Sequence, residues 1–262
     1  TFVRNNCWLD IKNTTAYKND YKVIKNLSIK LFDKERIIIL GPNGAGKSAI
    51  VDLINRNIYP IVKKDSYFRI FNDELIDIWK VRKYISTVNN EIKLRINKHL
   101  KVRDILLSGL YGKFCKINNP KIEDLIKVKE LIEKMLLNDI ADKKFGYLSD
   151  GEKQISIIAR AIINNPKVLI LDEPSVNIDL KSRIFLIKKI QDLSQLGISI
   201  LCITHDISII TKDYNRVIFL KDREIIRDGK PSELMTNKNI NQLFDIDIKL
   251  IENSNSWDIC RG

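Results

Sequence analysis

Apolar residues along the chain gather in short, nearly continuous runs that predict buried strands. The clearest runs occupy residues 36–40, 168–171 and 198–203, and each is followed by residues typical of a turn or a site: Gly-Pro, Asp-Glu-Pro or Thr-His. A strand that is apolar on both faces belongs in a sheet covered on both sides, as parallel sheets usually are. These runs therefore predict the centre of a parallel sheet.

Two further runs, residues 216–221 and 223–226, are separated only by Asp222. Such a short polar interruption predicts a tight turn between two antiparallel strands. The predicted sheet thus gains a hairpin.

Other segments place their apolar residues at helical spacing. One helix face follows the first apolar run and comprises Ala49, Ile50, Leu53 and Ile54. Two more are predicted between about residues 98 and 147. The first comprises Val102, Ile105, Leu106 and Leu110, and the second comprises Leu125, Val128, Leu131, Ile132, Met135 and Leu136. This block predicts a helical insertion in an α/β core.

The composition narrows the class of protein. The chain has four cysteines without a CxxC pair and two histidines, so neither a disulfide scaffold nor a zinc site is expected, and a reducing cytosol fits best. No apolar run approaches the roughly 20 residues that cross a bilayer, and no charged-then-apolar leader opens the chain. If the protein serves a membrane process, a partner must supply the membrane span.

The positive charge of the chain is unevenly distributed. The net charge is +12, and residues 80–100 contain six Lys or Arg residues against Glu91 alone. Such a patch would suit nucleic acid, anionic lipid headgroups or an acidic partner. The alternative is an ordinary solvated surface in a lysine-rich chain, and both interpretations stay open.

A phosphate-binding motif lies between a predicted strand and a predicted helix. Residues 41–48, GPNGAGKS, match the pattern G-x-x-x-x-G-K-[ST]. Glycines let successive backbone N–H groups point at phosphates, and the following helix presents the positive end of its dipole. Lys47 should reach the β- and γ-phosphates, and the Ser48 hydroxyl should bind Mg²⁺. The expected ATP-binding residues are Gly41, Asn43, Gly44, Ala45, Gly46, Lys47 and Ser48.

Two adjacent acids end the second apolar run. Asp172 follows a buried strand, where a carboxylate is costly unless it serves a cation or hydrogen bonds, so we expect it to hold Mg²⁺ directly or through water. Glu173 would then face the γ-phosphate and deprotonate the attacking water as the catalytic base. For either acid alone the alternative is a helix N-cap.

Residues 148–154, LSDGEKQ, resemble the LSGGQ signature of ATP-binding-cassette (ABC) ATPases. In that family's order and spacing, ARA at 159–161 and NPKVLILDEP at 165–174 come next, then SVNID at 175–179, similar to the D-loop, and Thr204-His205-Asp206, similar to the switch histidine segment. The resemblance covers essentially the whole chain from about Trp8, and the ordered motifs together make it specific.

The resemblance implies the fold class: an α/β P-loop NTPase core with a mostly parallel sheet, an antiparallel β portion and a helical subdomain that carries the signature motif. We expect one ABC ATPase domain over residues 1–262. Residues 1–97 and 151–262 would form the nucleotide-binding core, and residues 98–150 the helical subdomain.

The resemblance also implies how ATP is bound. Two chains, as a homodimer or a heterodimer with another ABC ATPase, would pack head to tail, with each ATP between one phosphate loop and the other chain's signature. Ser149 and the backbone N–H of Gly151 would contact the γ-phosphate across the interface. His205 would sense the γ-phosphate and act with the catalytic machinery.

The same resemblance assigns an aromatic residue to the adenine base. Tyr17 lies near the place where the family stacks such a residue, and Trp8 and Tyr21 are the alternatives.

One loop departs from the family pattern. Members usually carry a glutamine, after a stretch resembling residues 84–86, that touches Mg²⁺ and the attacking water and relays to the membrane partner. Here the aligned residue is Thr87, with Asn89 and Asn90 nearby. Thr87 or Asn89 would still offer an oxygen ligand with a shorter reach, which implies weaker coupling to a permease and slower hydrolysis.

The overall pattern favours a transporter subunit. Residues 77–82, 105–109 and 228–235 resemble ATPases of iron-siderophore and cobalamin importers and of molybdate-type cassettes. The leading interpretation is an ATP-binding and ATP-hydrolysing subunit of an ABC transporter, cytoplasmic and held at the inner face of the plasma membrane by separate permease subunits.

Two other functions are alternatives to the transporter subunit. The first is a soluble ABC ATPase without a permease, acting in iron–sulfur assembly or on nucleic acid, although no aromatic stacking array supports the latter. The second is a nucleotide switch with little turnover, against which intact Glu173 and His205 argue.

Overall fold

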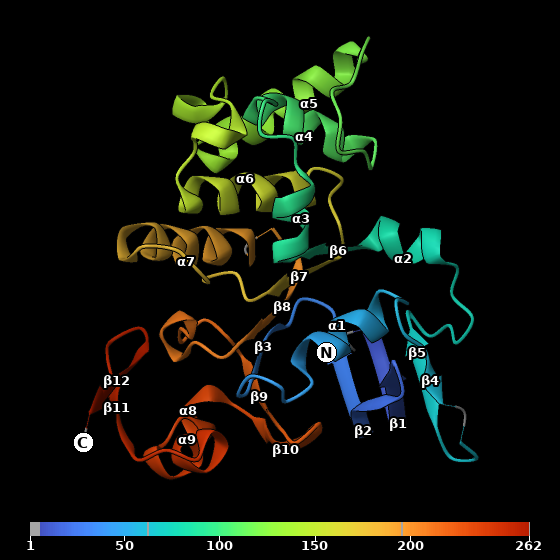
Figure 1. Ribbon diagram of the computed structural model, residues 1–262, viewed down its shortest axis with the longest axis vertical. Coiled ribbons are helices and arrows are strands. Elements are labelled where there is room, and N and C mark those ends of the chain that lie inside the picture. Colours follow the sequence, from blue (N-terminus) through green and yellow to red (C-terminus); the bar gives the residue numbers. More distant parts are fainter. Residues whose placement is uncertain (1–5, 62, 195, 262) are drawn as a thin grey trace, which may run out of the picture.

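The computed structural model describes residues 6–61, 63–194 and 196–261. Within these residues a six-stranded sheet has the order β10-β9-β3-β8-β7-β6 (Figure 1). Its strands are β3 (Arg36–Leu40), β6 (Ile85–Val88), β7 (Val168–Asp172), β8 (Ser199–Thr204), β9 (Arg216–Lys221) and β10 (Glu224–Gly229). All neighbouring strands pair in parallel except β10, which is antiparallel to β9. The predicted parallel centre, its hairpin and the α/β class are confirmed.

Side chains along the central strand β3 alternate between two hydrophobic cores. Ile38 and Leu40 pack in the core that contains the helical layer, whereas Ile37 and Ile39 pack in the core that contains α1 and the N-terminal strands. Because both faces of the sheet are covered, the four buried positions of the strand, residues 37–40, are all apolar. This is the physical reason that a continuous apolar run predicts it.

An antiparallel sheet built on β1 covers one side of the molecule. Its strands are β1 (Cys7–Lys18), β2 (Tyr21–Phe32), β4 (Pro60–Ile61) and β5 (Tyr67–Ile70), and β1 pairs with each of the others. Helix α1 (Lys47–Ile54) contacts β2 of this sheet and β7 and β8 of the central sheet. The helix that begins at the phosphate loop is therefore fixed between the two sheets.

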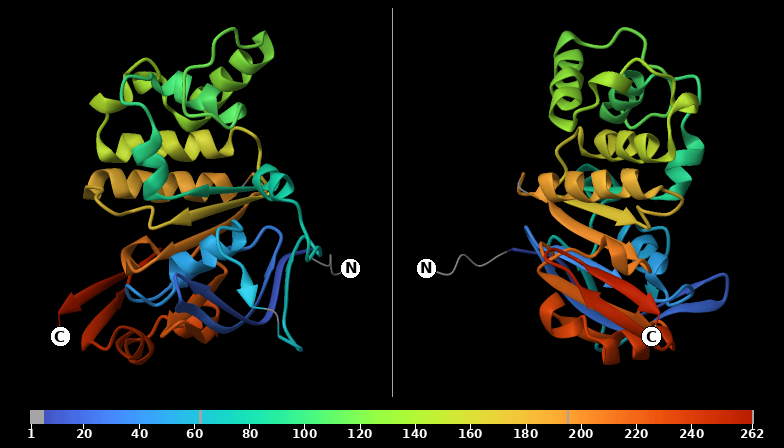
Figure 2. Two further views of the ribbon diagram at one scale, coloured as in Figure 1. Left: turned by 45° about the vertical axis from the view of Figure 1, so that its right-hand side comes forward. Right: turned by 90° about the vertical axis from the view of Figure 1, so that its left-hand side faces the viewer.

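Helices form layers on the other side of the central sheet (Figure 2). Helix α7 (Leu180–Ser194) lies next to the sheet, α6 (Asp150–Ile162) packs on α7, and α4 (Val102–Leu110) and α5 (Ile122–Met135) pack on α6. Two short helices, α2 (Ile78–Tyr84) and α3 (Asn90–Arg95), flank β6. The predicted helical block is thus present, while the division of the chain after residues 97 and 150 stays a prediction.

The C-terminal segment packs against β9, β10 and the turn that follows β8. It contains α8 (Pro231–Leu234), α9 (Asn237–Phe244) and a hairpin of β11 (Ile248–Glu252) and β12 (Trp257–Arg261). Strand β12 contacts the turn Ile207–Ile209, and Trp257 is buried there. None of the helices in the described residues is long and apolar enough to cross a membrane.

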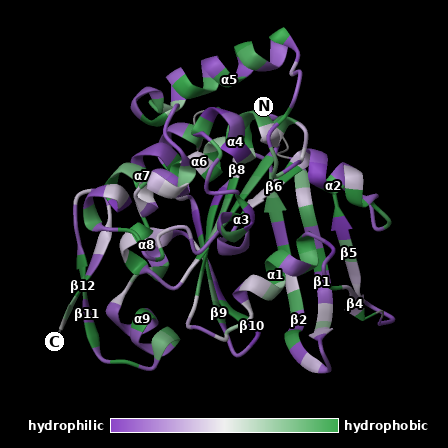
Figure 3. Cartoon of the chain, turned by 45° about the horizontal axis from the view of Figure 1, so that its top comes forward, coloured by the Kyte–Doolittle hydropathy of each residue, from purple (hydrophilic) through white to green (hydrophobic). Residues whose placement is uncertain are grey.

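The predicted apolar face of α5 is partly wrong. Val128, Ile132 and Met135 are buried, but Leu125 is 48% exposed and Leu136 is 65% exposed. Helix α5 lies on the outside of the helical layer, where polar and apolar residues alternate along it (Figure 3), so that only a narrow stripe is covered. Leu136 comes after the last helical residue, in a left-handed conformation with φ of 56°.

Truncating α5 at two positions tests this assignment. Ile132→Ala should lower the free energy of unfolding by about 2–4 kcal/mol, because it leaves a cavity in the core. The control Leu125→Ala should change it by less than about 1 kcal/mol, because about half of that side chain is in solvent. Urea titration followed by circular dichroism measures both values, and equal losses would contradict the burial assigned to this helix.

Candidate functional site: an ATP-binding cassette

The phosphate loop, residues 41–46, connects β3 to α1. Gly44 and Gly46 have φ of 82° and 98°, in the left-handed region that glycine adopts without strain. A Cβ atom on Gly41 would lie 2.1 Å from the carbonyl oxygen of Leu220 in β9. Glycine at these positions therefore permits both the curvature of the loop and its close passage over the neighbouring strand.

The first turn of α1 is open to an anion. Gly46 occupies the N-cap position without a side-chain hydrogen bond, and the first turn contains no acidic residue. Backbone N–H groups at a helix start have no partner within the helix and carry the positive end of its dipole. This end of α1 is therefore suited to phosphate groups.

Lys47 is folded over the phosphate loop. Its side chain is 6% exposed, and Nζ donates hydrogen bonds to the carbonyl oxygens of Gly41 (2.8 Å) and Pro42 (3.0 Å). Nζ also lies 3.5 Å from Oε1 of Glu173. Burial lowers the pKa of the Lys47 amine, and the carboxylates of Glu173 and Asp172 oppose that change.

Glu173 is held at the carboxyl ends of β7 and β8. Its carboxylate accepts hydrogen bonds from the Thr204 hydroxyl (3.2 Å) and the His205 backbone N–H (3.4 Å), and Oε1 lies 2.9 Å from Nδ1 of His205. The backbone of Glu173 has φ of 51°, an uncommon conformation for a residue with a side chain. The structure thus brings together Lys47, Glu173 and His205, three of the residues that the sequence singled out.

Asp172 and Ser48 place two side-chain oxygen atoms close together, next to Lys47. The Ser48 hydroxyl donates to Oδ1 of Asp172 over 3.5 Å, and burial raises the pKa of Asp172 to about 6. Among the described residues no group of three or more His, Cys, Asp or Glu side chains could hold a metal ion. Mg²⁺, however, is typically bound by one or two protein oxygens together with substrate phosphates and water. The Ser48 hydroxyl and the half-buried Asp172 carboxylate, whose negative charge lacks a full counter-charge, therefore fit MgATP.

The signature segment begins helix α6. Ser149 is its N-cap: Ser149 Oγ accepts from the backbone N–H of Glu152 (3.2 Å), and the Glu152 carboxylate accepts from the backbone N–H of Ser149 (2.7 Å). In this role the Ser149 hydroxyl acts as an acceptor, so its hydrogen remains available to donate. A Cβ on Gly151 would lie 2.2 Å from Cβ of Ser182, so glycine lets α6 approach α7 closely.

Asp150 occupies the place of a glycine in the LSGGQ pattern, and it is paired with lysines. Its carboxylate lies 2.7 Å from Nζ of Lys93 on α3 and 3.6 Å from Nζ of Lys153 on α6. The Lys93 partner holds the pKa of Asp150 below its usual range. An ion pair therefore joins the signature helix to the helix that follows β6.

Tyr17 lies on the hairpin that approaches the phosphate loop. The ring of Tyr17 is 40% exposed, and the amine of Lys22 lies 5.8 Å from its centroid. In the same hairpin, the carbonyl oxygen of Val23 lies 2.7 Å from where a Cβ of Gly46 would be. Tyr17 is thus on a segment beside the loop, and its contact with adenine stays a prediction.

The two alternatives to Tyr17 differ in exposure. Trp8 is 1% exposed, so its ring is committed to the core and cannot stack on a base. Tyr21 is exposed and remains an alternative.

The loop after β6 places Asn89, rather than Thr87, beside the acidic strand end. Thr87 lies within β6 and donates a hydrogen bond to the side chain of Asn55 over 3.0 Å. Val88, the last residue of β6, pairs with Leu171 in parallel register, so Asn89 follows at the level of Asp172. The Asn89 side chain caps α3 by accepting from the backbone N–H of Ile92 over 3.1 Å.

Several contacts around the site were not predicted from the sequence. The Ser175 hydroxyl donates to Asp206 over 3.0 Å, which joins the segment after Glu173 to the segment after His205. The backbone N–H of Arg223, in the β9–β10 turn, donates to the carbonyl oxygen of Ala45 over 3.0 Å. These contacts join residues far apart in the chain, so no local pattern reveals them.

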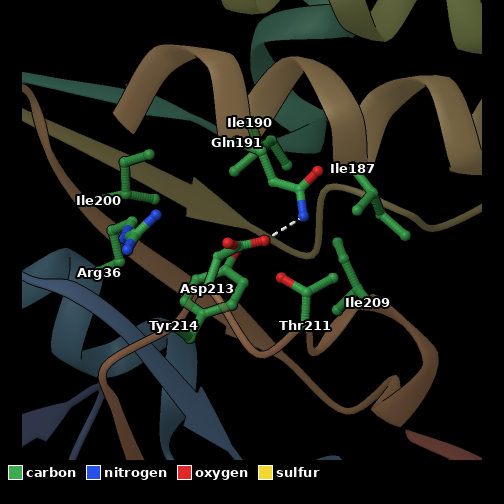
Figure 4. Close-up of a pocket in the computed structure, with 9 residues that line it drawn as sticks. All are labelled: Arg36, Ile187, Ile190, Gln191, Ile200, Ile209, Thr211, Asp213 and Tyr214. Carbon is green, nitrogen blue, oxygen red and sulfur yellow. Dashed lines mark hydrogen bonds between the residues drawn. The ribbon is translucent and has the colours of Figure 1, made fainter. Parts of the chain in front are cut away.

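A small cavity elsewhere is a packing feature. It lies between α7 and the segment after β8, where Gln191 is hydrogen-bonded to Asp213 (Figure 4). Its volume is about 10 Å³, enough for about one water, and the buried hydroxyl group of Thr211 beside it has no hydrogen-bond partner among the described residues. Its lining shares no residue with the phosphate loop, Glu173, His205 or the signature.

Curated relatives match nearly the whole chain. The ABC transporter ATP-binding protein YmeB of Lactococcus lactis is 27% identical, over 90% of this chain and 92% of that protein. The petrobactin import ATP-binding protein YclP of Bacillus subtilis is 26% identical, over 92% of this chain and 94% of that protein. A zinc import ATP-binding protein of Hydrogenovibrio crunogenus is 28% identical, over 89% of this chain and 86% of that protein. The relatives thus include importers of different solutes and do not single out one of them.

Solved structures agree on the fold. The CbiO1 structure of Clostridium perfringens, part of the CbiONQ transporter complex, superimposes with a TM-score of 0.77 at 26% identity, over 90% of this chain and 94% of that one. A chain of a metal-chelate type ABC transporter superimposes with a TM-score of 0.78 at 22% identity, over 97% of this chain and 98% of that one. The sequence profile of the family described as ABC transporter matches residues 24–176, more than half of the chain. With the phosphate loop, the acidic strand end and His205 brought together, this chain belongs to the ABC transporter family as an ATP-binding cassette.

Proposed function

We propose that this chain hydrolyses ATP, with Glu173 as the catalytic base and His205 as its partner. The observation that carries the proposal is the position of the Glu173 carboxylate, 3.5 Å from Nζ of Lys47 and 2.9 Å from Nδ1 of His205. Lys47 is the amine that reaches phosphates in loops of this type. A base beside that amine is placed to take a proton from a water that attacks the terminal phosphate.

Mg²⁺ would be held by Ser48 and Asp172 together with the phosphates of ATP. The metal would neutralise charge on the β- and γ-phosphate oxygens. Lys47, the N–H groups of the phosphate loop and the start of α1 bind and orient the same phosphates from the protein side. Tyr17 would stack on the adenine.

ATP would also join two chains head to tail, as a homodimer or as a heterodimer with another ABC ATPase. Ser149 and the backbone N–H of Gly151, at the start of α6, would receive the γ-phosphate bound to the opposite chain. This is supported by the helix start itself, a natural anion site, and by the free hydroxyl hydrogen of Ser149.

A separate permease would dock in the groove beside β6, which would hold the chain at the inner face of the membrane. This groove, which we call the β6 groove, has a volume of about 410 Å³. Its lining includes Thr87 and Asn89 from the segment at the end of β6 and Gly109 and Ala161 from the helical layer. A partner in this groove would contact both layers of the cassette at once. The family match favours this arrangement over a permease-free role.

Glu173→Gln tests the catalytic assignment. The variant can still accept the hydrogen bond from the Thr204 hydroxyl but loses the base, so the steady-state rate of ATP hydrolysis should fall by about 10²- to 10⁴-fold. With MgATP the variant should elute from gel filtration as a dimer, and with ATP plus a chelator as a monomer. The matched control Glu133→Gln, on the exposed face of α5, should behave as wild type. Wild-type turnover in Glu173→Gln would remove Glu173 from the mechanism.

The same trapped variant tests the permease partner. Tagged Glu173→Gln protein, captured from its own cells in mild detergent with MgATP, should carry a multi-span membrane protein in a fixed ratio. Mass spectrometry identifies that protein and, through it, the solute class. Capture of soluble partners or nucleic acid alone would contradict a role in transport.

The Asp150–Lys93 pair gives a prediction specific to this chain. Lys93→Ala leaves Asp150 without its closest cation near the expected γ-phosphate site, so a several-fold higher ATP concentration should be needed for dimer formation, in line with the less than about 1 kcal/mol that exposed pairs contribute. Asp150→Gly should lower the required concentration, because it removes a like charge. The double variant should resemble Asp150→Gly alone. Analytical ultracentrifugation in the Glu173→Gln background measures the three ATP concentrations. If Lys93→Ala raises the required concentration by the same factor with and without Asp150→Gly, Lys93 acts independently of Asp150.

A further inference from the structure

Two arginines meet on one aromatic ring at the end of the β6 groove. The guanidinium carbons of Arg95 and Arg160 each lie 4.2 Å from the ring centroid of Phe114. Arg95 ends α3, Arg160 is near the end of α6, and Phe114 follows α4. All three line the groove. Helix α3 packs against α6, which holds these side chains together although they are far apart in the chain.

No carboxylate in the described part of the chain balances the positive charge of this cluster. Neither arginine forms an ion pair with a carboxylate among the described residues; Arg160 donates through Nη2 to the carbonyl oxygen of Lys113 over 2.9 Å, and its Nε is buried without a hydrogen-bond partner. Burial, together with the charge of Arg95, lowers the pKa of Arg160 to about 10. Burying a charge is costly unless it is paired, and a second like charge adds to the cost. An anion from outside the chain would remove this cost.

The rest of the groove adds to the imbalance. Its lining contains a third arginine, Arg82, and a single acid, Glu91. These residues belong to the basic segment 80–100, for which nucleic acid, lipid headgroups and an acidic protein partner were open alternatives. The groove lies between the β6 layer and the helical layer, and its lining includes the half-buried apolar side chains of Ile92, Phe114 and Ala161. A partner that fills it must therefore present apolar surface together with negative charge, which a protein segment does.

Guanidinium chemistry specifies the anion. Arginine presents a planar fork of N–H donors that matches a carboxylate with two parallel hydrogen bonds. The aromatic ring of Phe114 keeps both guanidinium planes in place by cation–π contact, so little side-chain freedom is lost when a carboxylate binds.

We propose that Arg95, Phe114 and Arg160 form a receptor for one aspartate or glutamate side chain, carried by the permease segment that docks in the β6 groove. This inference rests on the proposed function, in which a separate permease binds that groove. The carboxylate would balance the positive charge of Arg160 and fix the position of the permease segment along the groove.

A zero-length cross-link tests the contact. Arg95→Lys places a primary amine at the receptor, and Arg95 is exposed, so the fold should be retained. Membranes that contain this variant, with Glu173→Gln as the trap, are treated with a carbodiimide, which joins an amine to a carboxylate in contact with it. We expect an amide bond from position 95 to an Asp or Glu of a multi-span membrane protein, mapped by peptide mass spectrometry. The control is Arg82→Lys, in the same groove but outside the cluster; a link from position 82 and none from position 95 would overturn the assignment.

Charge reversal measures what the contact contributes. Arg95→Glu should lower the amount of membrane protein captured per cassette by at least about tenfold, because it sets two carboxylates against each other. Hydrolysis by the detached cassette should be unchanged, because Arg95 is outside the nucleotide site. Replacing the mapped partner carboxylate with arginine should restore capture, which a merely structural role for Arg95 would not allow.

The remaining outcomes separate this proposal from the one on which it stands. If the trapped cassette with native Arg95 captures no multi-span membrane protein, the transport role fails and the receptor proposal fails with it. If capture is normal and Arg95→Glu leaves it unchanged, the receptor proposal alone is wrong. Saturable thermal stabilisation by inorganic phosphate alone, lost in Arg95→Glu, would show a free-anion site and overturn the proposal. Loss of binding to vesicles of anionic lipid without loss of permease capture would overturn it in favour of a headgroup site.

Discussion

The nucleotide site depends on the way Glu173 is held at the carboxyl edge of the central sheet. Parallel strands end at the same edge, so residues that follow β3, β7 and β8 meet there although they are distant in the chain. The φ of 51° at Glu173 costs about 1 kcal/mol or more in backbone strain. Its backbone N–H donates to the carbonyl oxygen of Ile203 over 2.8 Å, and its carboxylate is fixed by Thr204 and His205. The strained conformation directs the carboxylate at Lys47 and the phosphate loop, while Asp172, one residue earlier, faces Ser48.

The start of α6 carries an electrostatic conflict that this chain resolves with lysines. Asp150 and Glu152 lie in the first turn, where acidic side chains stabilise a helix. A phosphate bound at the same end would be repelled by these charges. The glycine that the signature pattern usually has in place of Asp150 carries no charge and would not repel it. Lys93 and Lys153 offset Asp150, and Lys93 comes from α3. The signature helix is thereby tied to the segment after β6, in which the usual glutamine is missing.

Sequence patterns correctly predicted elements that are buried along their whole length. They predicted burial wrongly where one element is partly buried and partly exposed to solvent. Strands β3, β7 and β8 are covered on both faces, so apolar composition alone reveals them. The phosphate loop was predictable because the positive φ angles of Gly44 and Gly46 are a local backbone requirement that glycine meets without strain. Leu125 has the correct helical spacing but lies where α5 faces solvent, which depends on the outer position of that helix. The strand register that places Asn89 level with Asp172, and the meeting of Arg95 with Arg160 on Phe114, are tertiary facts without a local signal.

Helix α6 links the two ends of the cassette's action. It begins at Ser149, the residue assigned to the nucleotide of the opposite chain, and Arg160 of the β6 groove lies in its last turn. With 13 residues it is about 20 Å long, and it packs between α7 and α4 along its length. Because packed helices shift as whole elements, a displacement of α6 at Ser149 would carry Arg160 with it. Both ends are also tied to the same neighbour: Lys93 of α3 pairs with Asp150 at the start, and Arg95 of α3 shares Phe114 with Arg160 at the end. In the proposed function, nucleotide binding at Ser149 and partner docking in the β6 groove would therefore act on the same two packed helices, α3 and α6, without contact between nucleotide and permease.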